Sequence, residues 1–563
     1  MRKEKMIMKT NKYIVLLLSV VLAFGACSES YLEQPPYGSV LTQAQYNQLS
    51  NTLEGSVRGV YSMLYAVSDH DLFGQRSIDL STDLLSGDVA LTAYSYGWYY
   101  VDEQGQTATS RTGYVWSFYY QMMRNINKVV ASVNTQGDIL KRIAENGLPN
   151  TIDAKNEVCY TIVDGDTLAT FTATEAAIAG YYAQALTVRG YIYSQLTQLY
   201  SATTKVLGST WKEEEVFPIY NENNFEEAQP LATLEEAYQQ VETDLTTAIS
   251  YFDAFGELLV RVSKLNVDAN VARGILAYSY LNKAAPSLPS ASSDYTKALK
   301  YAAEVIETNE YQVIPNEDVL TNGFNSLDDK SWIWGQDVVI ETAGGLASFF
   351  GQVDIHSYSY AWAGDVKAID ENLYNEIPEY DIRKKWFNDG SKNPQFKLAP
   401  DGKFFSAKNP TSTKDEDLDR EWLSDNVFMR IESMYLIAAE ASYRLKEYDQ
   451  SIDYLRGVTD QRVDTTATAA SEYATYLSGL SGIKLLQAIE YNWRVEMWGE
   501  GYALQTLRRL SSETITDPKG RKRGANHSYE AGSSIDGSAS KFIFPIPSSE
   551  TSYNPHYGTK LPL

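Results

Sequence analysis

The chain has few of the residues that metal sites, disulfide frameworks and nucleic-acid surfaces need. It holds two cysteines and four histidines in 563 residues, and the histidines show no paired spacing, which argues against a zinc site. Basic residues are also scarce, with 48 Lys and Arg against 72 Asp and Glu. This negative balance argues against nucleic acid as a partner, because a phosphate backbone is bound by Lys and Arg.

Long hydrophobic runs are missing too, except near the N-terminus. Residues 14–24 (IVLLLSVVLAF) form an apolar run that follows five Lys and Arg residues. The run is too short to span a bilayer and suits the core of a signal peptide. Small residues precede Cys27, so we expect residues 1–26 to be a cleaved signal peptide and Cys27 to be lipidated. The sequence FGAC resembles a bacterial lipoprotein signal; a plain secretory signal with a chance cysteine is the alternative.

Removal of residues 1–26, which hold five basic residues and one acidic residue, leaves 43 basic and 71 acidic residues. Residues 27–50 contain a Pro-Pro pair and predict an extended tether after the lipidated cysteine. Residues 51–563 predict a single domain. A body of this length can bury a large core, and Cys159 on its own cannot form a disulfide within one chain. We expect Cys159 to be a small buried hydrophobe.

Apolar residues recur at helical spacing in much of the domain. Thr174 and Thr233 are the expected N-caps of two of the helices. Small residues such as Gly190 would let neighbouring helices approach closely. The paired helices carry a weak repeat of aromatic and small residues that is like the second helix of a tetratricopeptide repeat, with generic hairpin packing as the alternative. The predicted helices begin at Asn51 with a pattern that runs to Leu64, and they cover residues 113–133, 174–200, 234–252, 264–283, 294–308, 427–446, 448–462 and 481–510.

Two regions, around 76–113 and 310–426, lose the helical period and collect Gly, Ser and aromatic residues. Aromatic rings on loops suit a sugar, since they cover its apolar face while polar side chains bind its hydroxyls. Ordinary packing is the alternative for each ring. The candidate ligand-binding residues are Tyr94, Tyr96, Trp98, Tyr99, Tyr100, Tyr358, Tyr360 and Trp362, with Asp83, Asp88, Asp102, His356 and Asp365 as polar neighbours.

Other tryptophans fit the core better. Trp116, Trp493 and Trp498 fall on the periodic helices, so we expect them to be buried. Trp332 and Trp334 alternate in SWIWG, which predicts half-buried residues of a strand.

The sequence holds no G-x-S-x-G, H-E-x-x-H or G-x-x-x-x-G-K-[ST] motif. Glu496 and Glu500 are spaced i, i+4 near Arg494, Arg508 and Arg509, which fits either a catalytic cluster or a structural ion-pair network. Acidic pairs are so common in this chain that a glycosidase-like carboxylate pair stays open. We expect no cofactor.

Two charged segments have a plain interpretation. Asp415-x-Asp417-x-Asp419 resembles the start of a calcium loop, but Arg420 and Asn426 stand where such a loop needs Gly and Glu. We therefore expect a solvated acidic loop and no metal. The basic residues of segment 519–523 predict an exposed loop.

Several stretches together resemble the SusD/RagB family of nutrient-binding outer-membrane lipoproteins of Bacteroidetes. They are the lipoprotein cysteine followed by Tyr31-Leu32-Glu33, GYVWSFYYQMMRNINKVV, ALTVRGYIYSQLTQLY, VARGILAYSYL with YTKALKYAAEVI, MRIESMYLIAAEASYRL, AIEYNWRVEMWGEGYALQTLRR and FIFPIPSSETSYNP. They occur in the family's order and span nearly the whole chain after Cys27. Glu33 departs from the family, which more often has Asp.

The resemblance implies a mainly α-helical fold, with tetratricopeptide-like hairpins around 174–308 and 427–510 and an irregular, loop-rich ligand-binding part. It implies a non-catalytic protein that captures an oligosaccharide outside the cell. Peptide capture on the same fold is the first alternative, and a surface glycoside hydrolase is the second. It also implies a TonB-dependent (SusC-like) outer-membrane transporter as partner and a lipid anchor in the outer membrane.

Overall fold

The computed structural model describes residues 52–557, apart from 94–95, 97, 106, 108–110, 134–138, 260, 262, 340, 392, 406–422 and 516–519. The predicted signal peptide, the whole predicted tether with Cys27, the candidate ring Tyr94 and the acidic segment 415–419 lie outside the described residues. A compact unit begins at Ser56.

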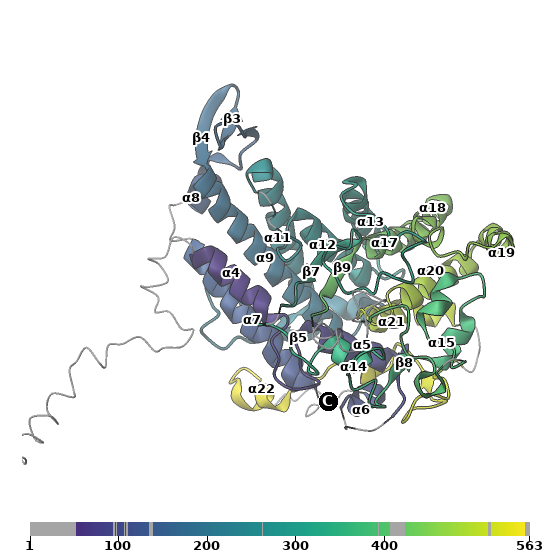
Figure 1. Ribbon diagram of the computed structural model, residues 1–563. Coiled ribbons are helices and arrows are strands. Elements are labelled where there is room, and N and C mark those ends of the chain that lie inside the picture. The colour runs from purple at the N-terminus through teal and green to yellow at the C-terminus, as the bar shows by residue number, and fades with distance from the viewer. Residues whose placement is uncertain are drawn as a thin grey trace, which may run out of the picture. The chain divides into compact units, whose positions relative to one another are not determined.

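A row of packed helices forms one side of this unit (Figure 1). The helix α9 (Ala173–Leu199) packs between α7 (Thr112–Val133) and α11 (Leu234–Phe255). The row continues through α12 (Ala269–Lys283) and α13 (Ala291–Glu307). It then passes through α17 (Ile431–Arg444) to α18 (Tyr448–Thr459) and α20 (Ile483–Glu496), and α20 packs on α21 (Ala503–Thr514). Consecutive helices therefore meet as hairpins, which agrees with the predicted mainly α, tetratricopeptide-like fold.

The starts of these helices follow from local chemistry. Thr233 accepts a hydrogen bond from the backbone N–H of Glu236, whose carboxylate accepts one from the Thr233 N–H, so the predicted cap is confirmed as a capping box. The prediction of Thr174 as a cap is wrong by two residues. Thr172 forms the same box with Glu175, because the glutamate three residues on completes the pair.

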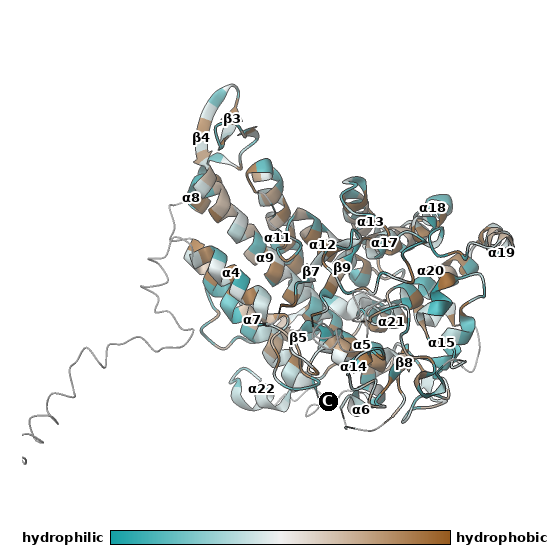
Figure 2. Ribbon diagram, viewed as in Figure 1, coloured by the Kyte–Doolittle hydropathy of each residue, from teal (hydrophilic) through white to brown (hydrophobic). Residues whose placement is uncertain are grey.

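Close packing of α9 on α11 depends on a glycine, which has no side chain. A Cβ atom added to Gly190 would lie 2.6 Å from Cγ of Leu245 on α11. The small residue predicted at this position therefore lets two long helices touch. Figure 2 shows the hydrophobic and hydrophilic residues interleaved along these helices, as expected for helices with one face in a core.

A second part of the unit is built from short elements around a separate aromatic core. Its large buried side chains include Phe324, Trp386, Phe404 and Trp498. Residues from 310–405 supply most of this core, and α5 (Gln75–Ser86), β1 (Val89–Leu91) and a few residues from other segments, such as Val495 and Trp498, add to it. The loop-rich region predicted from residue 310 is therefore held by its own core, which fixes the loops that carry candidate ligand residues.

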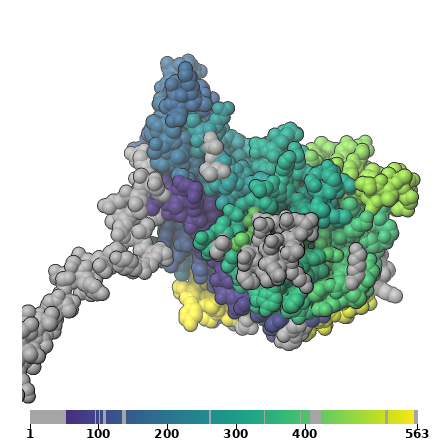
Figure 3. Space-filling view, viewed as in Figure 1, coloured from purple at the N-terminus to yellow at the C-terminus, as the bar shows by residue number. Residues whose placement is uncertain are grey.

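The strands are short and form small antiparallel sheets. One sheet, β2–β3–β4, projects beyond the ends of α9 and α11 (Figures 1 and 3). In the antiparallel sheet β7–β9, Trp332 pairs with Arg430, so the sheet connects the two parts of the unit. The strands are β2 (Thr151–Asp153), β3 (Val158–Val163), β4 (Asp166–Thr172), β5 (Glu215–Pro218), β6 (Leu231–Thr233), β7 (Trp332–Gln336), β8 (Lys367–Ile369), β9 (Asn426–Arg430), β10 (Arg521–Lys522) and β11 (Ser534–Ile535).

Several short helices connect these parts. None of the described helices has the combination of length and hydrophobicity that crossing a bilayer requires. The remaining helices are α4 (Thr52–Met63), α6 (Tyr100–Gln104), α8 (Ile139–Asn146), α10 (Thr204–Leu207), α14 (Phe349–Val353), α15 (Glu371–Glu376), α19 (Ala467–Ser478) and α22 (Ser548–Tyr553).

Three sequence predictions about local structure are corrected. The segment from residue 76 forms α5 rather than a loop, and nearly every residue of α5 is buried, so the helix has no polar face to reveal its period. Trp332 and Trp334 are fully buried rather than half-buried. In the basic segment 519–523, Arg523 is buried and donates to the Leu85 carbonyl oxygen, so that part is not an exposed loop. Trp116, Trp493, Trp498 and Cys159 are buried, as predicted.

Candidate ligand-binding site

Two segments that are far apart in the sequence bring their aromatic rings together. Tyr96 and Trp98 stack with ring centres 5.1 Å apart. Tyr360 lies edge-on to both, with its ring centre 4.8 Å from that of Tyr96 and 4.5 Å from that of Trp98. Such stacked and edge-on arrangements are the favoured geometries of aromatic pairs. The rings therefore support one another and form one aromatic patch from both candidate segments.

His70 completes this patch, and the sequence analysis did not identify it. Its ring stacks on Trp98 at 5.4 Å between centres, and its Nδ1 lies 2.7 Å from the Tyr360 hydroxyl oxygen. The backbone carbonyl of His70 accepts a hydrogen bond from the side-chain amide of Gln352. A single histidine in a loop gives no sequence signal for this role. We refer to His70, Tyr96, Trp98 and Tyr360 as the aromatic patch.

A second pair of rings stands close by in sequence, on the turn that carries Tyr360. Tyr358 and Trp362 have ring centres 5.7 Å apart and are 51% and 49% exposed. Ser359 shapes the turn by accepting a hydrogen bond from the Trp362 backbone N–H at 2.9 Å. Buried Asp354 accepts another from the His356 backbone N–H. The turn therefore presents two adjacent large rings to solvent, and a contiguous exposed apolar patch is a feature of binding surfaces.

Tyr99 and Asp102, which the sequence also suggested, lie inside the protein. Tyr99 is 1% exposed, and the guanidinium carbon of Arg111 lies 4.4 Å from its ring centre. Asp102 forms a buried ion pair with Arg111 at 3.0 Å. Neither residue faces solvent. The loss of helical period that suggested them therefore marks a packed segment here and not an exposed loop. Tyr100 is exposed and lies beside Tyr529, with ring centres 6.0 Å apart.

The acidic residues suggested as neighbours of the rings are buried as well. Asp83 accepts hydrogen bonds from the backbone N–H groups of Gly501 and Ala503 at 3.1 and 3.2 Å. Burial raises the pKa of Asp83 to about 8. Asp88 pairs with Arg494, and Asp365 pairs with Lys367. These carboxylates hold the scaffold together and are not available to a ligand at the surface.

A cleft of about 730 Å³ begins at His356, two residues before Tyr358. Its volume is in the range of small-molecule sites. Nε2 of His356 lies 2.9 Å from Oδ1 of Asp401. This hydrogen bond raises the pKa of His356 above its ordinary value, although burial opposes the rise. The other lining residues include Tyr374, Glu379, Asp381, Lys384, Lys385, Asn388 and Asn393. The cleft thus offers hydrogen-bond donors and acceptors together with charged side chains of both signs.

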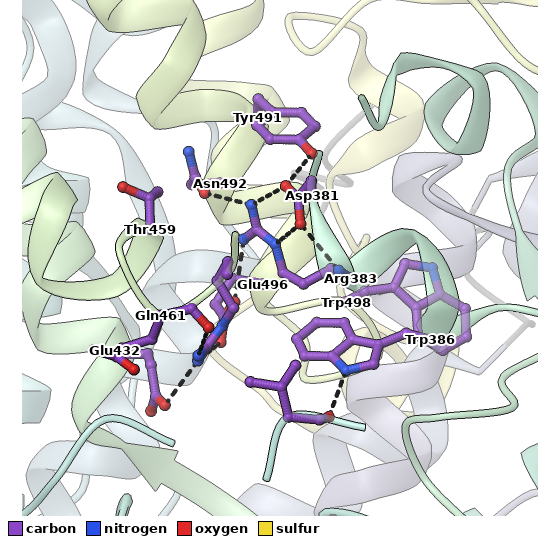
Figure 4. A network of polar contacts seen from close by, with 12 residues as sticks. Asp381, Arg383, Trp386, Glu432, Thr459, Gln461, Tyr491, Asn492, Glu496 and Trp498 are labelled. Carbon is purple, nitrogen blue, oxygen red and sulfur yellow. Dashed lines mark hydrogen bonds and ion pairs between the residues drawn. The ribbon is translucent and has the colours of Figure 1, made fainter. Parts of the chain in front are cut away.

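One lining residue, Asp381, is held from behind by a buried charge network (Figure 4). Arg383 donates to both carboxylate oxygens of Asp381 at 2.9 and 2.6 Å, and the Tyr491 hydroxyl donates to one of them at 2.7 Å. Nη1 of Arg383 also donates to Glu496 at 3.1 Å. Asp381 therefore has a fixed position at the wall of the cleft.

Glu496 and Glu500, which fitted either a catalytic cluster or an ion-pair network, lie in this network. Glu496 accepts hydrogen bonds from Arg430 and Arg462, each at 2.8 Å, as well as from Arg383. Glu500 pairs with Arg430 and Lys403. Although burial favours the neutral acid, the arginines hold the pKa of Glu496 well below its usual range. The partners are thus not the predicted Arg494, Arg508 and Arg509, and the full burial of Glu496 makes its role structural.

Comparison with known proteins decides the family. Residues 352–559 match the model described as "SusD family", and residues 162–276 match the model described as "Starch-binding associating with outer membrane". Together the two models cover more than half of the chain. The chain belongs to the SusD family. A comparison with curated proteins finds no match.

Solved structures show that this SusD-family protein shares its fold with relatives of low sequence identity. A SusD-like carbohydrate binding protein from Bacteroides vulgatus is 20% identical, with a TM-score of 0.64 and coverage of 91% of this chain and 98% of that one. A SusD superfamily protein from Bacteroides thetaiotaomicron is 17% identical, with a TM-score of 0.64 over 90% and 98% of the two chains. One from Bacteroides fragilis is 17% identical, with a TM-score of 0.63 over 91% and 99%. At these identities the likeness establishes the fold.

Proposed function

We propose that this SusD-family protein is a non-catalytic lipoprotein of the outer membrane that captures oligosaccharides at the cell surface and delivers them to a TonB-dependent, SusC-like transporter. The observation that carries the proposal is the meeting of Tyr96, Trp98 and Tyr360 in one aromatic patch, with Tyr358 and Trp362 exposed on the same turn. Exposed rings such as Tyr96, which is 46% exposed, can stack on the apolar face of a sugar, while Tyr360, which is 8% exposed, supports the patch from within the protein.

The neighbouring cleft supplies the polar contacts that a sugar also needs. Asn388, Asn393 and the His356–Asp401 pair offer donors and acceptors for hydroxyl groups. A site of exposed rings and a wide polar cleft binds through many weak contacts. The family description of starch binding at the outer membrane and the carbohydrate-binding relative support this ligand class.

Lipidation of Cys27 is part of the proposal. An acylated N-terminus would confine the protein to the membrane that holds its transporter. Confinement raises the effective concentration of the two partners, so a weak binder can still pass on its ligand. Residues 27–50 would act as the tether.

A second candidate is the capture of peptides. Lys384, Lys385, Glu379 and Asp389 line the cleft, and this mixture of charges suits the termini and side chains of a peptide as well as it suits a sugar.

A binding screen separates the two candidates. Oligosaccharides and mixed peptides are titrated into residues 28–563 by isothermal calorimetry. Saturable binding of an oligosaccharide that weakens in Trp98→Ala supports the proposal, and copurified or tightly bound peptides support the second candidate. Turnover of a bound glycan by the pure protein contradicts both.

A further inference from the structure

A second cleft, of about 440 Å³, shares no lining residue with the aromatic patch or the first cleft. It lies between α7, the end of β5 and α22, which Figure 1 shows close together. Three of its rings form a continuous wall. The ring centres of Trp116 and Tyr120 are 4.6 Å apart, and those of Tyr120 and Tyr220 are 5.7 Å apart. The Tyr120 hydroxyl donates to the Pro218 carbonyl oxygen at 2.9 Å, which holds the central ring in place.

The rest of the lining is acidic. Glu226, Glu227 and Glu550 line the cleft, and Arg124 is the one basic residue among its lining. In the part of the chain that the structure describes, none of the three carboxylates forms an ion pair with Lys, Arg or His. Glu550 accepts a hydrogen bond from the side-chain amide of Asn554 at 2.9 Å. The lining therefore carries an excess of negative charge beside the half-buried rings of Tyr120 and Tyr220.

A buried hydroxyl beside the cleft also lacks a partner. Tyr557 is 5% exposed, and among the described residues no group accepts from or donates to its hydroxyl. Burial, and after it the charge of nearby Glu550, raises the pKa of Tyr557, so the hydroxyl keeps its proton. A buried polar group without a partner is costly. Tyr557 is not itself a lining residue of the cleft, so its hydroxyl adds polarity behind the wall rather than a contact with a ligand.

From this combination we propose that the second cleft binds a small organic cation, an ammonium or guanidinium group carried on an apolar stem. The ring faces attract the positive charge through their quadrupoles, and the glutamates attract it directly and accept its hydrogen bonds. The apolar stem lies along Phe225 and the ring wall. The site is independent of the proposed oligosaccharide site, because the two share no residue.

The test compares two cationic probes with an uncharged analogue. Nα-acetyl-arginine amide, Nα-acetyl-lysine amide and Nα-acetyl-citrulline amide are titrated into the full chain and followed by ligand-observed NMR. Citrulline keeps the shape of arginine but carries no charge. We expect saturable binding of both cations, and roughly tenfold weaker binding of the citrulline probe.

Substitutions locate the site. The double variant Glu226→Gln/Glu227→Gln keeps the side-chain shapes, and both residues are exposed, so its fold is expected to be intact. We expect it to weaken binding of the arginine probe roughly tenfold. Glu145→Gln, an exposed glutamate on α8, is the matched control and should bind as the wild type does. Trp98→Ala should also leave binding of the cation unchanged.

Three results overturn the proposal. They are equal binding of the arginine and citrulline probes, equal weakening by Glu145→Gln and by the double variant, and absence of saturable binding up to millimolar probe. A loss of cation binding in Trp98→Ala would place the cation at the aromatic patch instead. Because the oligosaccharide screen uses other probes and addresses a site that shares no residue with this cleft, a failure here leaves the proposed function standing, and the reverse also holds.

Discussion

Replacement of Glu496 by glutamine tests whether the buried charge network holds the loop-rich part in place. The side chain is fully buried and faces Arg383, Arg430 and Arg462. Glutamine keeps the shape but removes the negative charge, so three guanidinium groups lose a shared counter-ion. Breaking a buried pair by removing one charge costs about 3–5 kcal/mol. The entropy of unfolding of a body of about 500 residues is on the order of 1 kcal/mol/K. We therefore expect Glu496→Gln to lower Tm by roughly 3–5 °C.

The assay is thermal unfolding followed by circular dichroism, with exposed Glu317→Gln as the matched control. The pH dependence gives a second readout. Because the pKa of Glu496 is lower in the folded protein, its contribution is present above the unfolded pKa of about 4.3 and is lost as pH falls through the folded pKa. The difference in Tm between the wild type and Glu496→Gln should thus become smaller in acid. A Tm of Glu496→Gln equal to that of the Glu317→Gln control at pH 7 would refute the reasoning.

Three other substitutions have direct readouts. Asp401→Asn should bring the pKa of His356, measured by NMR titration, down toward 6.5. In the wild type, the ion pair of protonated His356 with Asp401 is favoured below pH 6.5 and is lost as the pH rises through the pKa of the folded protein. An unchanged pKa of His356 in the variant would contradict this assignment. Gly190→Ala should destabilise the protein by roughly 1–2 kcal/mol in urea, because overpacking against Leu245 outweighs the gain in helix propensity, whereas higher stability would contradict the close approach. Cys27→Ala should fold and bind ligand normally but leave the membrane fraction, and a variant that stays with the membrane would disprove the anchor.

Several of the long helices could be predicted because one face meets solvent. The helix of residues 112–133 and the hairpins near 269–307 and 431–459 show a clear helical period in the sequence. The helix α5 could not be predicted in this way, because it is buried on nearly all sides and carries polar residues such as Asp83 inside the protein.

The projecting sheet was missed although a signal for it was present. Asp164 and Gly165 join β3 to β4 with positive φ angles of 53° and 89°, and an Asp-Gly pair between apolar runs is a strong hairpin signal. In contrast, the part that His70 plays gives no local signal, because it depends on contacts with Trp98 and Tyr360.

The candidate site was predictable in kind but not in arrangement. Rings in Gly- and Ser-rich segments pointed to Trp98, Tyr358 and Trp362, and the structure places Tyr358 and Trp362 at the surface and Trp98 in the aromatic patch. Composition could not separate these from Tyr99, which faces Arg111 inside the protein. The burial of a ring within a loop is decided by long-range packing, and the sequence of the loop does not report it.

The central claim, capture of oligosaccharides by the aromatic patch, is tested most directly by calorimetric titration of residues 28–563 with the best oligosaccharide from the screen. The wild type is compared with Trp98→Ala, Trp362→Ala and the control Trp211→Phe, which changes a buried ring outside both clefts. Loss of one stacked ring is worth about 1 kcal/mol. We predict that each alanine variant binds roughly fivefold more weakly while the control is unchanged. Unchanged binding of a confirmed oligosaccharide in both alanine variants would contradict the account.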